Sequence, residues 1–334
     1  MARNLITDIP GVRVGHADDA KLGSGATVVV FDKAVVASAD VRGGGPGTRE
    51  TALLDPAQTI EGIDAIVLSG GSAFGLDAAS GVQAYMREQG RGFRIRDAVV
   101  PIIPGAIMFD LLNGGDKNWG RYPPYRELAY QAAAGASVEF ALGSAGAGLG
   151  ATTATLKGGV GSASAQTRGG ITVGALVVVN AVGTVVVGDG PHFWAAPFEQ
   201  NGEFGGRGLP ARFTDSDLAI RAKGGPQNSG PNQNTTIAVI ATDAALTKAQ
   251  CNRLAVMAHD GYARAIYPVH TPLDGDVIFS AATGTIPLPD PYYGLAELGM
   301  IAGNVMARAI ARGIYEATAL PFPGALPSWK DRHG

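Results

Sequence analysis

The sequence predicts a globular protein of the α+β class, and three features of its pattern support that prediction. Short runs of β-branched and small apolar residues recur along the chain, and four other stretches carry apolar residues at helical spacing. Turns rich in glycine, proline and asparagine separate these segments. With 334 residues, 46% of them hydrophobic, the chain can bury a large core as one domain or as two closely packed ones.

The composition excludes several classes of partner. The formal net charge is −3 and Lys and Arg form no basic run, so we expect no nucleic-acid partner, which would need concentrated positive charge. No stretch reaches the ~20 uninterrupted apolar residues of a membrane span, and the first residues lack an apolar signal segment. The single cysteine, Cys251, cannot form an internal disulfide and fits a reducing compartment. These features predict a cytoplasmic protein with no membrane partner.

The chain begins with strands. Residues 26–31 and 34–38 are rich in β-branched and small apolar residues, and Asp32-Lys33 between them fits the two-residue turn of an antiparallel hairpin. A glycine-rich loop of mixed charge follows at 42–51, either a connector or a backbone segment that approaches a partner closely. A further strand is predicted at 63–68.

The residues after this strand predict a helix N-terminus. A glycine pair ending at Gly71 closes the strand, and apolar residues at helical spacing begin at Phe74. The first N–H groups of such a helix can bind a carbonyl oxygen or a carboxylate. Ser72 does not fit the nucleophile elbow G-x-S-x-G, because the next glycine, Gly75, comes one position too late. We therefore interpret Ser72 as the N-cap.

A glycine-rich stretch in the middle of the chain has the spacing of a nucleotide-binding motif. It follows an apolar, proline-broken segment at 99–112 and a short helix predicted at 126–134. Gly146, Gly148 and Ala151 match the dinucleotide fingerprint G-x-G-x-x-A. However, no helix pattern follows, and no carboxylate lies near the ~20-residue offset that holds a ribose. We expect no cofactor.

Lys157 and Asn180 each admit two interpretations. Lys157 stands alone in an apolar, glycine-rich region and is followed by glycine, which excludes a P-loop. It is either a surface lysine at a turn or a partly desolvated ammonium that stabilises a carboxylate. Asn180 lies between predicted strands at 171–179 and 184–187, a second hairpin, and is either a turn residue or an oxyanion donor.

A long loop without periodicity, 188–230, leads to the most informative stretch of the chain. Thr235 lies where a polar loop ending in Asn234 meets an apolar strand. If the Asn234–Thr235 bond were cut, the new α-amine, with a pKa near ~8, could take the proton of the threonine's own hydroxyl. Hydrolases with an N-terminal threonine nucleophile use this pairing. The alternative is a turn followed by two residues with good strand propensity.

The remaining chain predicts two helices and one strand. A capping box opens a helix at 247–265, a strand follows at 277–281 and a long helix at 295–317. Before the strand, Asp274 and Asp276 flank a glycine and form either an Asp-Gly turn or a pair of carboxylates on one side of an extended segment. The five histidines show no metal-ligand spacing, so we expect no metal site.

Taken in order, these segments resemble the P1 peptidase family, which includes DmpA-type L-aminopeptidase/D-esterases, β-peptidyl aminopeptidases and nylon-oligomer endohydrolases. The similarity spans nearly the whole chain, and the Asn-Thr-Thr and Asp-Gly-Asp motifs look most like the nylon-oligomer branch. The segments that carry it are 42–50, 69–77, 146–157, 173–180, 234–240 and 274–276.

The resemblance implies a four-layer αββα sandwich akin to the N-terminal-nucleophile hydrolases, made as one precursor and cut once. Cleavage would divide a single domain into residues 1–234 and 235–334, which stay associated. The implied activity is hydrolysis of amide bonds in short peptides, amino-acid amides or ω-amino-acid (nylon) oligomers. Family members also imply a homo-oligomer, a tetramer of processed heterodimers.

The resemblance also implies roles for individual residues. Thr235 corresponds to the nucleophile, the two aspartates to residues that position its amine and hydroxyl, and Asn180 and Lys157 to residues beside it. Gly71, Ser72 and Phe74 are expected to bind substrate, although the nylon hydrolase carries a tyrosine in place of Phe74. Two other functions stay open: an acyl transferase similar to ornithine acetyltransferase, and an unprocessed small-molecule-binding protein.

Overall fold

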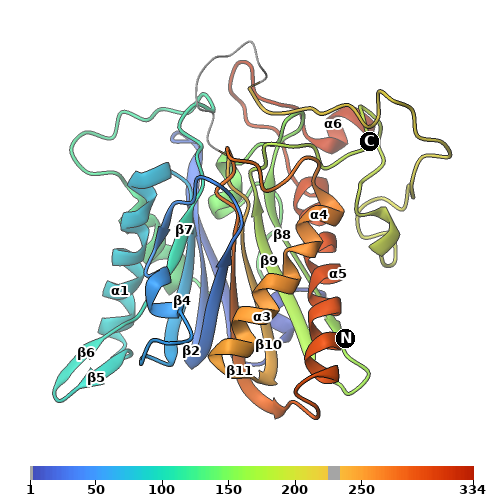
Figure 1. Ribbon diagram of the computed structural model, residues 1–334. Helices are drawn as coiled ribbons and strands as arrows, with labels where there is room; N and C mark the ends of the chain where they lie inside the picture. The colour runs from blue at the N-terminus through green and yellow to red at the C-terminus, as the bar shows by residue number, and fades with distance from the viewer. Residues whose placement is uncertain (1–2, 225–233) are drawn as a thin grey trace.

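The structure, a computed structural model, describes residues 3–224 and 234–334 and is built around a mixed β-sheet (Figure 1). Within these residues, nine strands share continuous hydrogen bonding in the order β3-β7-β4-β2-β11-β10-β9-β8, with β1 paired to β2. The strands are β1 Val12–Asp19, β2 Ser24–Val41, β3 Thr48–Arg49, β4 Gly62–Ser69, β7 Gly105–Ile107, β8 Gly159–Gln166, β9 Thr172–Val179, β10 Ile237–Ala245 and β11 Val277–Pro287. A separate hairpin joins β5 (Phe93–Ile95) to β6 (Ala98–Val100).

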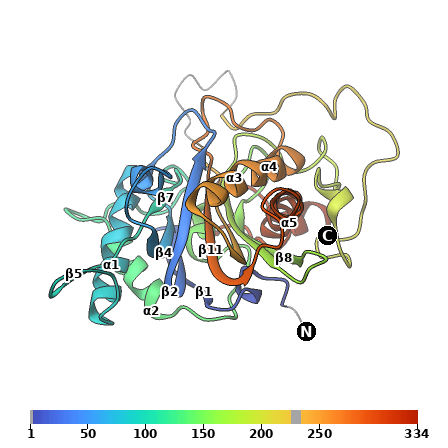
Figure 2. The same ribbon diagram turned by 60° about the horizontal axis from the view of Figure 1, so that its bottom comes forward.

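The helices cover the two outer faces of the sheet (Figures 1 and 2). One side carries α1 (Ala78–Glu88) and α2 (Tyr125–Ala134), and the other carries α3 (Lys248–Ala258), α4 (Asp260–Ala265) and α5 (Tyr293–Tyr315). The short α6 (Trp329–His333) lies near the C-terminus. In the part of the chain that the structure describes, no helix combines the length and the apolar character needed to cross a bilayer.

Strand β2 joins the two halves of the sheet. Its first half pairs with β1 and β4, whereas its second half pairs with β11, and the register with β4 shifts between Val30 and Val35. The hairpin predicted for 26–31 and 34–38 is therefore wrong, because both segments belong to this one strand. Asp32 and Lys33 are exposed at the register shift, which is why they look like a turn in the sequence. The first hairpin instead joins β1 to β2.

In the described part of the chain, three buried cores separate four layers. One core lies between α1, α2 and the outer face of β2 and β4. A second lies between the two halves of the sheet, and a third lies between β8–β11 and the helices α3, α4 and α5. The order of layers is thus helix, sheet, sheet, helix, which confirms the αββα expectation even though the strands are hydrogen-bonded continuously around the fold.

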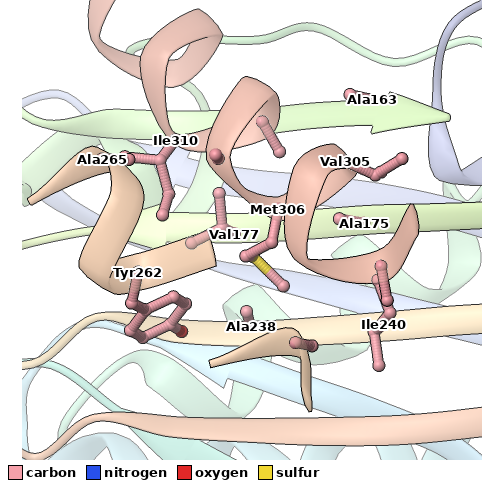
Figure 3. Close-up of a cluster of buried hydrophobic side chains, with 14 of the residues drawn as sticks. Ala163, Ala175, Val177, Ala238, Ile240, Tyr262, Ala265, Val305, Met306 and Ile310 are labelled. Carbon is pink, nitrogen blue, oxygen red and sulfur yellow. The ribbon is translucent and has the colours of Figure 1, made fainter. Parts of the chain in front are cut away.

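Strand β10 illustrates why the central strands contain so few polar residues. Ile237 and Val239 face the core between the two halves of the sheet, whereas Ala238 and Ile240 face α4 and α5 (Figure 3). Successive side chains point to opposite faces, and both faces are covered. The first five residues of β10, Ile237 to Ala241, are accordingly all apolar, as the sequence after Asn234 predicts, and Thr242 and Asp243 follow near the end of the strand.

The second predicted hairpin is also wrong. Strand β9 pairs with β8 on one edge and β10 on the other, so residues 184–187 have no edge to join. Thr184 and Val186 make only isolated bridges. Strand β8 was not predicted, because its glycines and serines lack the β-branched pattern typical of strands. Its glycines let α5 pack closely, since a Cβ at Gly161 would lie 1.8 Å from the Ala309 carbonyl oxygen.

The other predicted elements largely agree with the structure. The strand near 63–68 and the helices near 126–134 and 295–317 are present with small shifts of their ends, and the strand predicted at 277–281 starts where expected but extends to Pro287. The Thr247 capping box is formed, but the helix predicted to reach 265 is divided into α3 and α4 at His259. The loop predicted at 188–230 contains only a short 3₁₀-helix, Ala196–Phe198, up to residue 224, and its last part lies outside the described residues.

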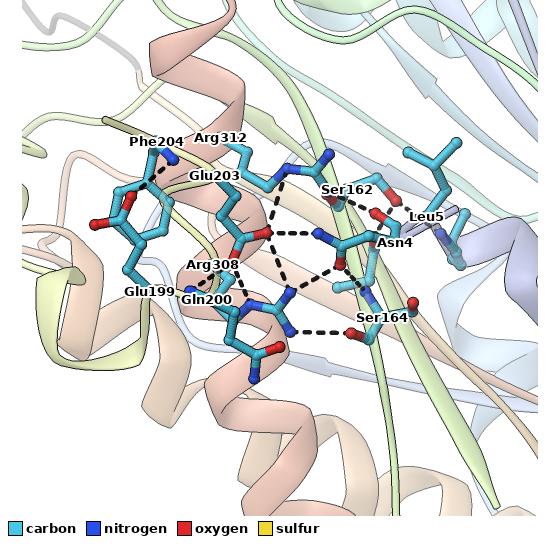
Figure 4. A network of polar contacts seen from close by, with 12 residues as sticks. Asn4, Leu5, Ser162, Ser164, Glu199, Gln200, Glu203, Phe204, Arg308 and Arg312 are labelled. Atoms are coloured by element: carbon cyan, nitrogen blue, oxygen red, sulfur yellow. Dashed lines mark hydrogen bonds and ion pairs between the residues drawn. The ribbon is translucent and has the colours of Figure 1, made fainter. Parts of the chain in front are cut away.

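A buried polar network anchors this loop to α5 (Figure 4). Arg308, itself only 2% exposed, donates to the Glu203 carboxylate at 2.5 Å, and Arg312 lies 3.5 Å from the same carboxylate. Asn4 donates to Glu203 at 2.6 Å, which ties the N-terminal segment to the same point. The charges are therefore paired within the protein, as buried charges must be.

Candidate active site

Thr235 lies at the junction between the long loop and β10, as the sequence predicts. The residue is 3% exposed, and its peptide N–H donates to the carbonyl oxygen of Asn180 at 2.9 Å. Asn234, on its N-terminal side, is fully buried and forms a parallel bridge with Asp274. The structure thus brings together segments that lie far apart in the sequence, around the Asn234–Thr235 bond.

The two aspartates lie on either side of this junction and are both 1% exposed. Asp274 accepts hydrogen bonds from the backbone N–H of Val182 at 3.2 Å and from the hydroxyl of Thr271 at 2.8 Å. Asp276 accepts from the backbone N–H of Thr236 at 2.8 Å. Burial, and then the nearby charge of Asp276, raises the pKa of the Asp274 carboxyl. The pair is therefore more than a surface Asp-Gly turn.

Gly275 occupies the space directly beneath the threonine side chain. Its N–H donates to the carbonyl oxygen of Asn234 at 2.7 Å. A Cβ atom at this position would lie 2.8 Å from Thr235 Oγ1 and 2.7 Å from the carbonyl oxygen of Gly45. Glycine is thus required by space here. The hydrogen bond also polarises the carbonyl group that immediately precedes the threonine.

Lys157 is buried, which contradicts the interpretation of a surface lysine. Its Nζ donates to the carbonyl oxygens of Gly148, Ala151 and Gly158 at 2.8, 2.9 and 2.9 Å. Burial lowers the pKa of Lys157 to about 7, and the charge of Asp110 opposes that shift. An ammonium group has three N–H bonds, so these carbonyls satisfy all of them. Lys157 therefore shapes the glycine-rich loop and supplies charge, without a spare donor for substrate.

Asn180 connects the threonine to this loop. Its side-chain Oδ1 accepts from the Thr152 N–H at 3.0 Å and from Lys223 Nζ at 3.1 Å, and its Nδ2 donates to the Phe109 carbonyl at 3.1 Å. A side-chain amide has two N–H bonds, and Phe109 uses one of them. The carbonyl oxygen of Asn180 holds Thr235, so the residue does more than form a turn.

A cavity of about 520 Å³ adjoins the Asn234–Thr235 junction, because Asn234 is one of its lining residues. Its polar walls include Asp110, Lys157, Lys223 and Asn234, and apolar side chains complete it. The apolar walls include Phe109, Leu112, Leu320, Pro323 and Leu326. Burial raises the pKa of Asp110 and lowers that of Lys223, because each charge is removed from water. A cavity of this size and mixture suits a small molecule with both polar and apolar parts.

Gly71, Ser72 and Phe74, the predicted substrate-binding residues, do not line the cavity. Gly71 donates its N–H to Asp110 at 2.8 Å, so it supports a wall of the cavity. Phe74 is 52% exposed and packs edge-on against Trp119, with the ring centres 5.4 Å apart. It does not line the cavity. Ser72 is not an N-cap as predicted, because Gly71 holds that position, no side-chain cap bond forms and Ser72 has a φ of 52°.

Sequence reasoning missed Asp110, Lys223 and Gly275 as parts of the site. Asp110 and Lys223 stand in segments that look like ordinary loops, and only the fold brings them to one cavity. Gly275 gave a signal that could have been used, namely a glycine between two carboxylates. Among the residues 3–224 and 234–334, no group of three or more His, Cys, Asp or Glu side chains could hold a metal ion.

Comparison with known families decides where this arrangement belongs. Residues 4–324 match the family model described as peptidase family S58. The chain belongs to peptidase family S58. A curated relative from Mycobacterium tuberculosis (strain ATCC 25618 / H37Rv), described as an uncharacterized aminopeptidase, is 44% identical over 98% of this chain and 97% of its own length. The family model and this relative together confirm the resemblance to DmpA-type peptidases that the sequence shows.

Two further similar proteins have descriptions that name an activity. A 6-aminohexanoate-oligomer endohydrolase of Kocuria sp. (strain KY2) is 28% identical over 91% of this chain and 84% of its own length. The L-aminopeptidase D-Ala-esterase/amidase of Ochrobactrum anthropi, described as a variant of the Ntn-hydrolase fold, superposes with a TM-score of 0.72 at 20% identity. That superposition covers 98% of this S58 chain and 91% of the other, and it confirms the N-terminal-nucleophile-hydrolase-like fold.

Proposed function

We propose that this S58 family member is a self-processing amide hydrolase of the aminopeptidase type, with Thr235 as its N-terminal nucleophile. One observation carries the proposal. The Thr235 hydroxyl lies against Gly275, whose N–H holds the Asn234 carbonyl at 2.7 Å, between two buried aspartates. A nucleophile, a polarised carbonyl and carboxylates to manage protons are the parts that such chemistry requires.

Self-cleavage is the first of two reactions in this proposal. Thr235 Oγ attacks the carbonyl carbon of Asn234, and the C–N bond breaks as the amine of Thr235 takes up the hydroxyl proton. The result is an ester between Asn234 and the threonine side chain, which water hydrolyses to a carboxylate and the free hydroxyl. Gly275 N–H stabilises the negative charge that develops on the Asn234 oxygen.

Turnover of substrate repeats the same chemistry. The freed amine of Thr235 acts as general base while Oγ attacks the substrate amide, the amine product leaves, and water releases the acyl group. Asp276 lies close enough to bind the backbone N–H of Thr236 at 2.8 Å, and we assign it to hold the new ammonium group. Asn234 is a wall of the cavity, so its release as a chain end would open the cavity towards the nucleophile.

The substrate class follows from the cavity and from the relatives. Charged and apolar walls together suit a short peptide or amino-acid amide, the class implied by the aminopeptidase descriptions of the relatives. Because the 6-aminohexanoate-oligomer endohydrolases are also relatives, ω-amino-acid oligomers belong on the list of substrates to try. A panel of α-amino-acid, β-amino-acid and 6-aminohexanoate p-nitroanilides, scored by amine release, distinguishes these classes.

Denaturing electrophoresis with intact mass tests the proposal. The wild type should yield two fragments, 1–234 and 235–334, and Thr235→Ala should remain one inactive chain. Thr235→Ser keeps a hydroxyl and serves as the matched control, which should still be cut. Cleavage or amide hydrolysis that persists in Thr235→Ala would refute the proposal.

A further inference from the structure

A group of three aromatic rings, His259, Tyr262 and His270, lies beside Asp276 and contributes no residue to the walls of the cavity. His270 stacks on Tyr262 with ring centres 5.6 Å apart, and it meets the ring of His259 edge-on at 4.9 Å. Tyr262 is fully buried, and its hydroxyl lies 3.1 Å from the carbonyl oxygen of Thr236, to which it donates. His259 contacts the carbonyl oxygen of Asp40 through Nε2 at 3.1 Å. The rings therefore hold His270 in one orientation.

His270 makes two contacts with one oxygen of Asp276. Its ring Nδ1 lies 2.8 Å from Asp276 Oδ2, and its backbone N–H donates to the same oxygen at 3.2 Å. The other oxygen, Oδ1, accepts from the N–H of Thr236. Because a carboxylate only accepts hydrogen bonds, Nδ1 of His270 must carry the proton. Both oxygens of Asp276 are thus fixed, one by the nucleophile segment and the other by His270.

The backbone of His270 shows that this placement is demanding. Its φ is 55°, in the left-handed region that residues other than glycine rarely adopt. The side chain is 22% exposed, whereas the carboxylate it contacts is 1% exposed. An unusual backbone conformation held beside a reacting group points to a positioning role.

We propose that His270 is a positioning residue, which orients the Asp276 carboxylate towards Thr235 through its Nδ1–H. The inference rests on the proposed function, because the orientation of Asp276 matters only if that carboxylate serves the threonine. Without the ring donor, Asp276 Oδ2 keeps one backbone donor and the carboxylate can rotate away from the nucleophile. His270 is absent from the walls of the cavity, so its loss should act on the chemical step rather than on substrate binding.

Three substitutions of His270 distinguish the contribution of its N–H donor from that of its aromatic ring. In His270→Asn, the side-chain Nδ2 stands near the place of Nδ1, and asparagine tolerates a positive φ better than most residues. In His270→Gln, the amide lies one bond further out, nearer the place of Nε2. His270→Leu removes the donor completely. His192→Leu is the control, since His192 lies in a different loop and contacts the Gly208 carbonyl.

Two rates are measured for each variant: conversion of the precursor into two fragments, and hydrolysis of the p-nitroanilide that the wild type cleaves fastest. We expect His270→Gln and His270→Leu to lower both rates on the order of 10- to 100-fold with KM changed less than about twofold, because small misplacements of reacting groups have effects of this size. His270→Asn and His192→Leu should stay within about threefold of the wild type. Thermal melting identifies any variant that fails to fold. If His270→Leu does not fold, the rates of His270→Asn and His270→Gln are compared with each other to test the positioning role.

The outcomes separate the two proposals. Wild-type rates in His270→Gln, or an equal loss in His270→Asn and His270→Gln, overturn the positioning role and leave the threonine mechanism intact. Cleavage and hydrolysis in Thr235→Ala instead overturn the proposed function, and with it the role of His270. Rescue by asparagine with an unchanged KM supports the inference, because a purely structural role would not depend on the place of one donor.

Discussion

Replacing Gly275 by alanine tests the geometry of the proposed cleavage site most directly. The added Cβ would lie 2.7 Å from the carbonyl oxygen of Gly45, 2.8 Å from Thr235 Oγ1 and 3.1 Å from Thr235 Cγ2. Contacts between such atoms below about 3 Å are not tolerated, so the threonine side chain or the 274–276 backbone must move. In the proposed mechanism, this movement displaces the Thr235 hydroxyl from the Asn234 carbonyl carbon that it attacks.

The expected size of the effect follows from this displacement. A shift approaching 1 Å at a reacting group can cost about 100-fold in rate, so we expect self-cleavage and turnover of Gly275→Ala to fall on the order of 10- to 100-fold. Overpacking of a buried site should also lower the free energy of unfolding by about 1–3 kcal/mol. The fold should survive, because the strain is confined to one contact region.

A time course gives the assay. The precursor is produced by cell-free synthesis, and its conversion to the two fragments is followed by denaturing electrophoresis and intact mass. Gly45→Ala is the matched control: it lies in the facing loop, but the atoms nearest to its added Cβ would be 3.7 and 3.9 Å away. Wild-type cleavage by Gly275→Ala, or equal impairment of the two variants, would show that the space beneath Thr235 does not govern the reaction.

Three further measurements test the electrostatics of the fold. Lys157→Met leaves three buried carbonyl oxygens without their donor and should lower the free energy of unfolding, measured in urea, by at least about 3 kcal/mol. The control, Lys33→Met at an exposed position, should change it little. Equal losses in the two variants would contradict the buried contacts of Lys157. Burial lowers the pKa of His259 to about 4, so the unfolded chain binds more protons between pH 6.5 and 4 and stability falls as the pH falls. His259→Gln should therefore lose about 2 kcal/mol less than the wild type between pH 7.5 and 5, and parallel losses would refute this. Burial raises the pKa of Cys251 to about 12, so a thiol reagent at pH 8 should label the protein only as it unfolds, and fast labelling of the native state would contradict the burial.

Local pattern in the sequence predicts those elements whose signal is complete within a few residues. The capping box at Thr247, the long C-terminal helix and the apolar strand after Asn234 all carry such signals, and the structure contains them. The two predicted hairpins failed for different reasons, both of which depend on pairing between strands. Residues 26–31 and 34–38 belong to one strand, β2, whose register with β4 shifts between Val30 and Val35. Residues 184–187 cannot pair with β9, because β8 and β10 occupy both of its edges.

The candidate site divides in the same way. Thr235, Asp274 and Asp276 stand out in the sequence because a hydroxyl residue opens a strand and two carboxylates precede another, and β10 and β11 pair in parallel so that these ends meet. The roles of Lys157 and His270 could not be read, because each depends on groups that face it in space. Three carbonyl oxygens surround the lysine, and one carboxylate oxygen faces the histidine ring.

By itself, then, the sequence determined the α+β class, the family and the threonine at the boundary of loop and strand. These depend on side-chain type and spacing along the chain. The tertiary structure alone decided that β2 links two layers, that Gly275 N–H holds the Asn234 carbonyl, and that Lys157 is buried. Burial, hydrogen bonding and steric fit are properties of groups brought together from distant parts of the chain, so no local pattern can specify them.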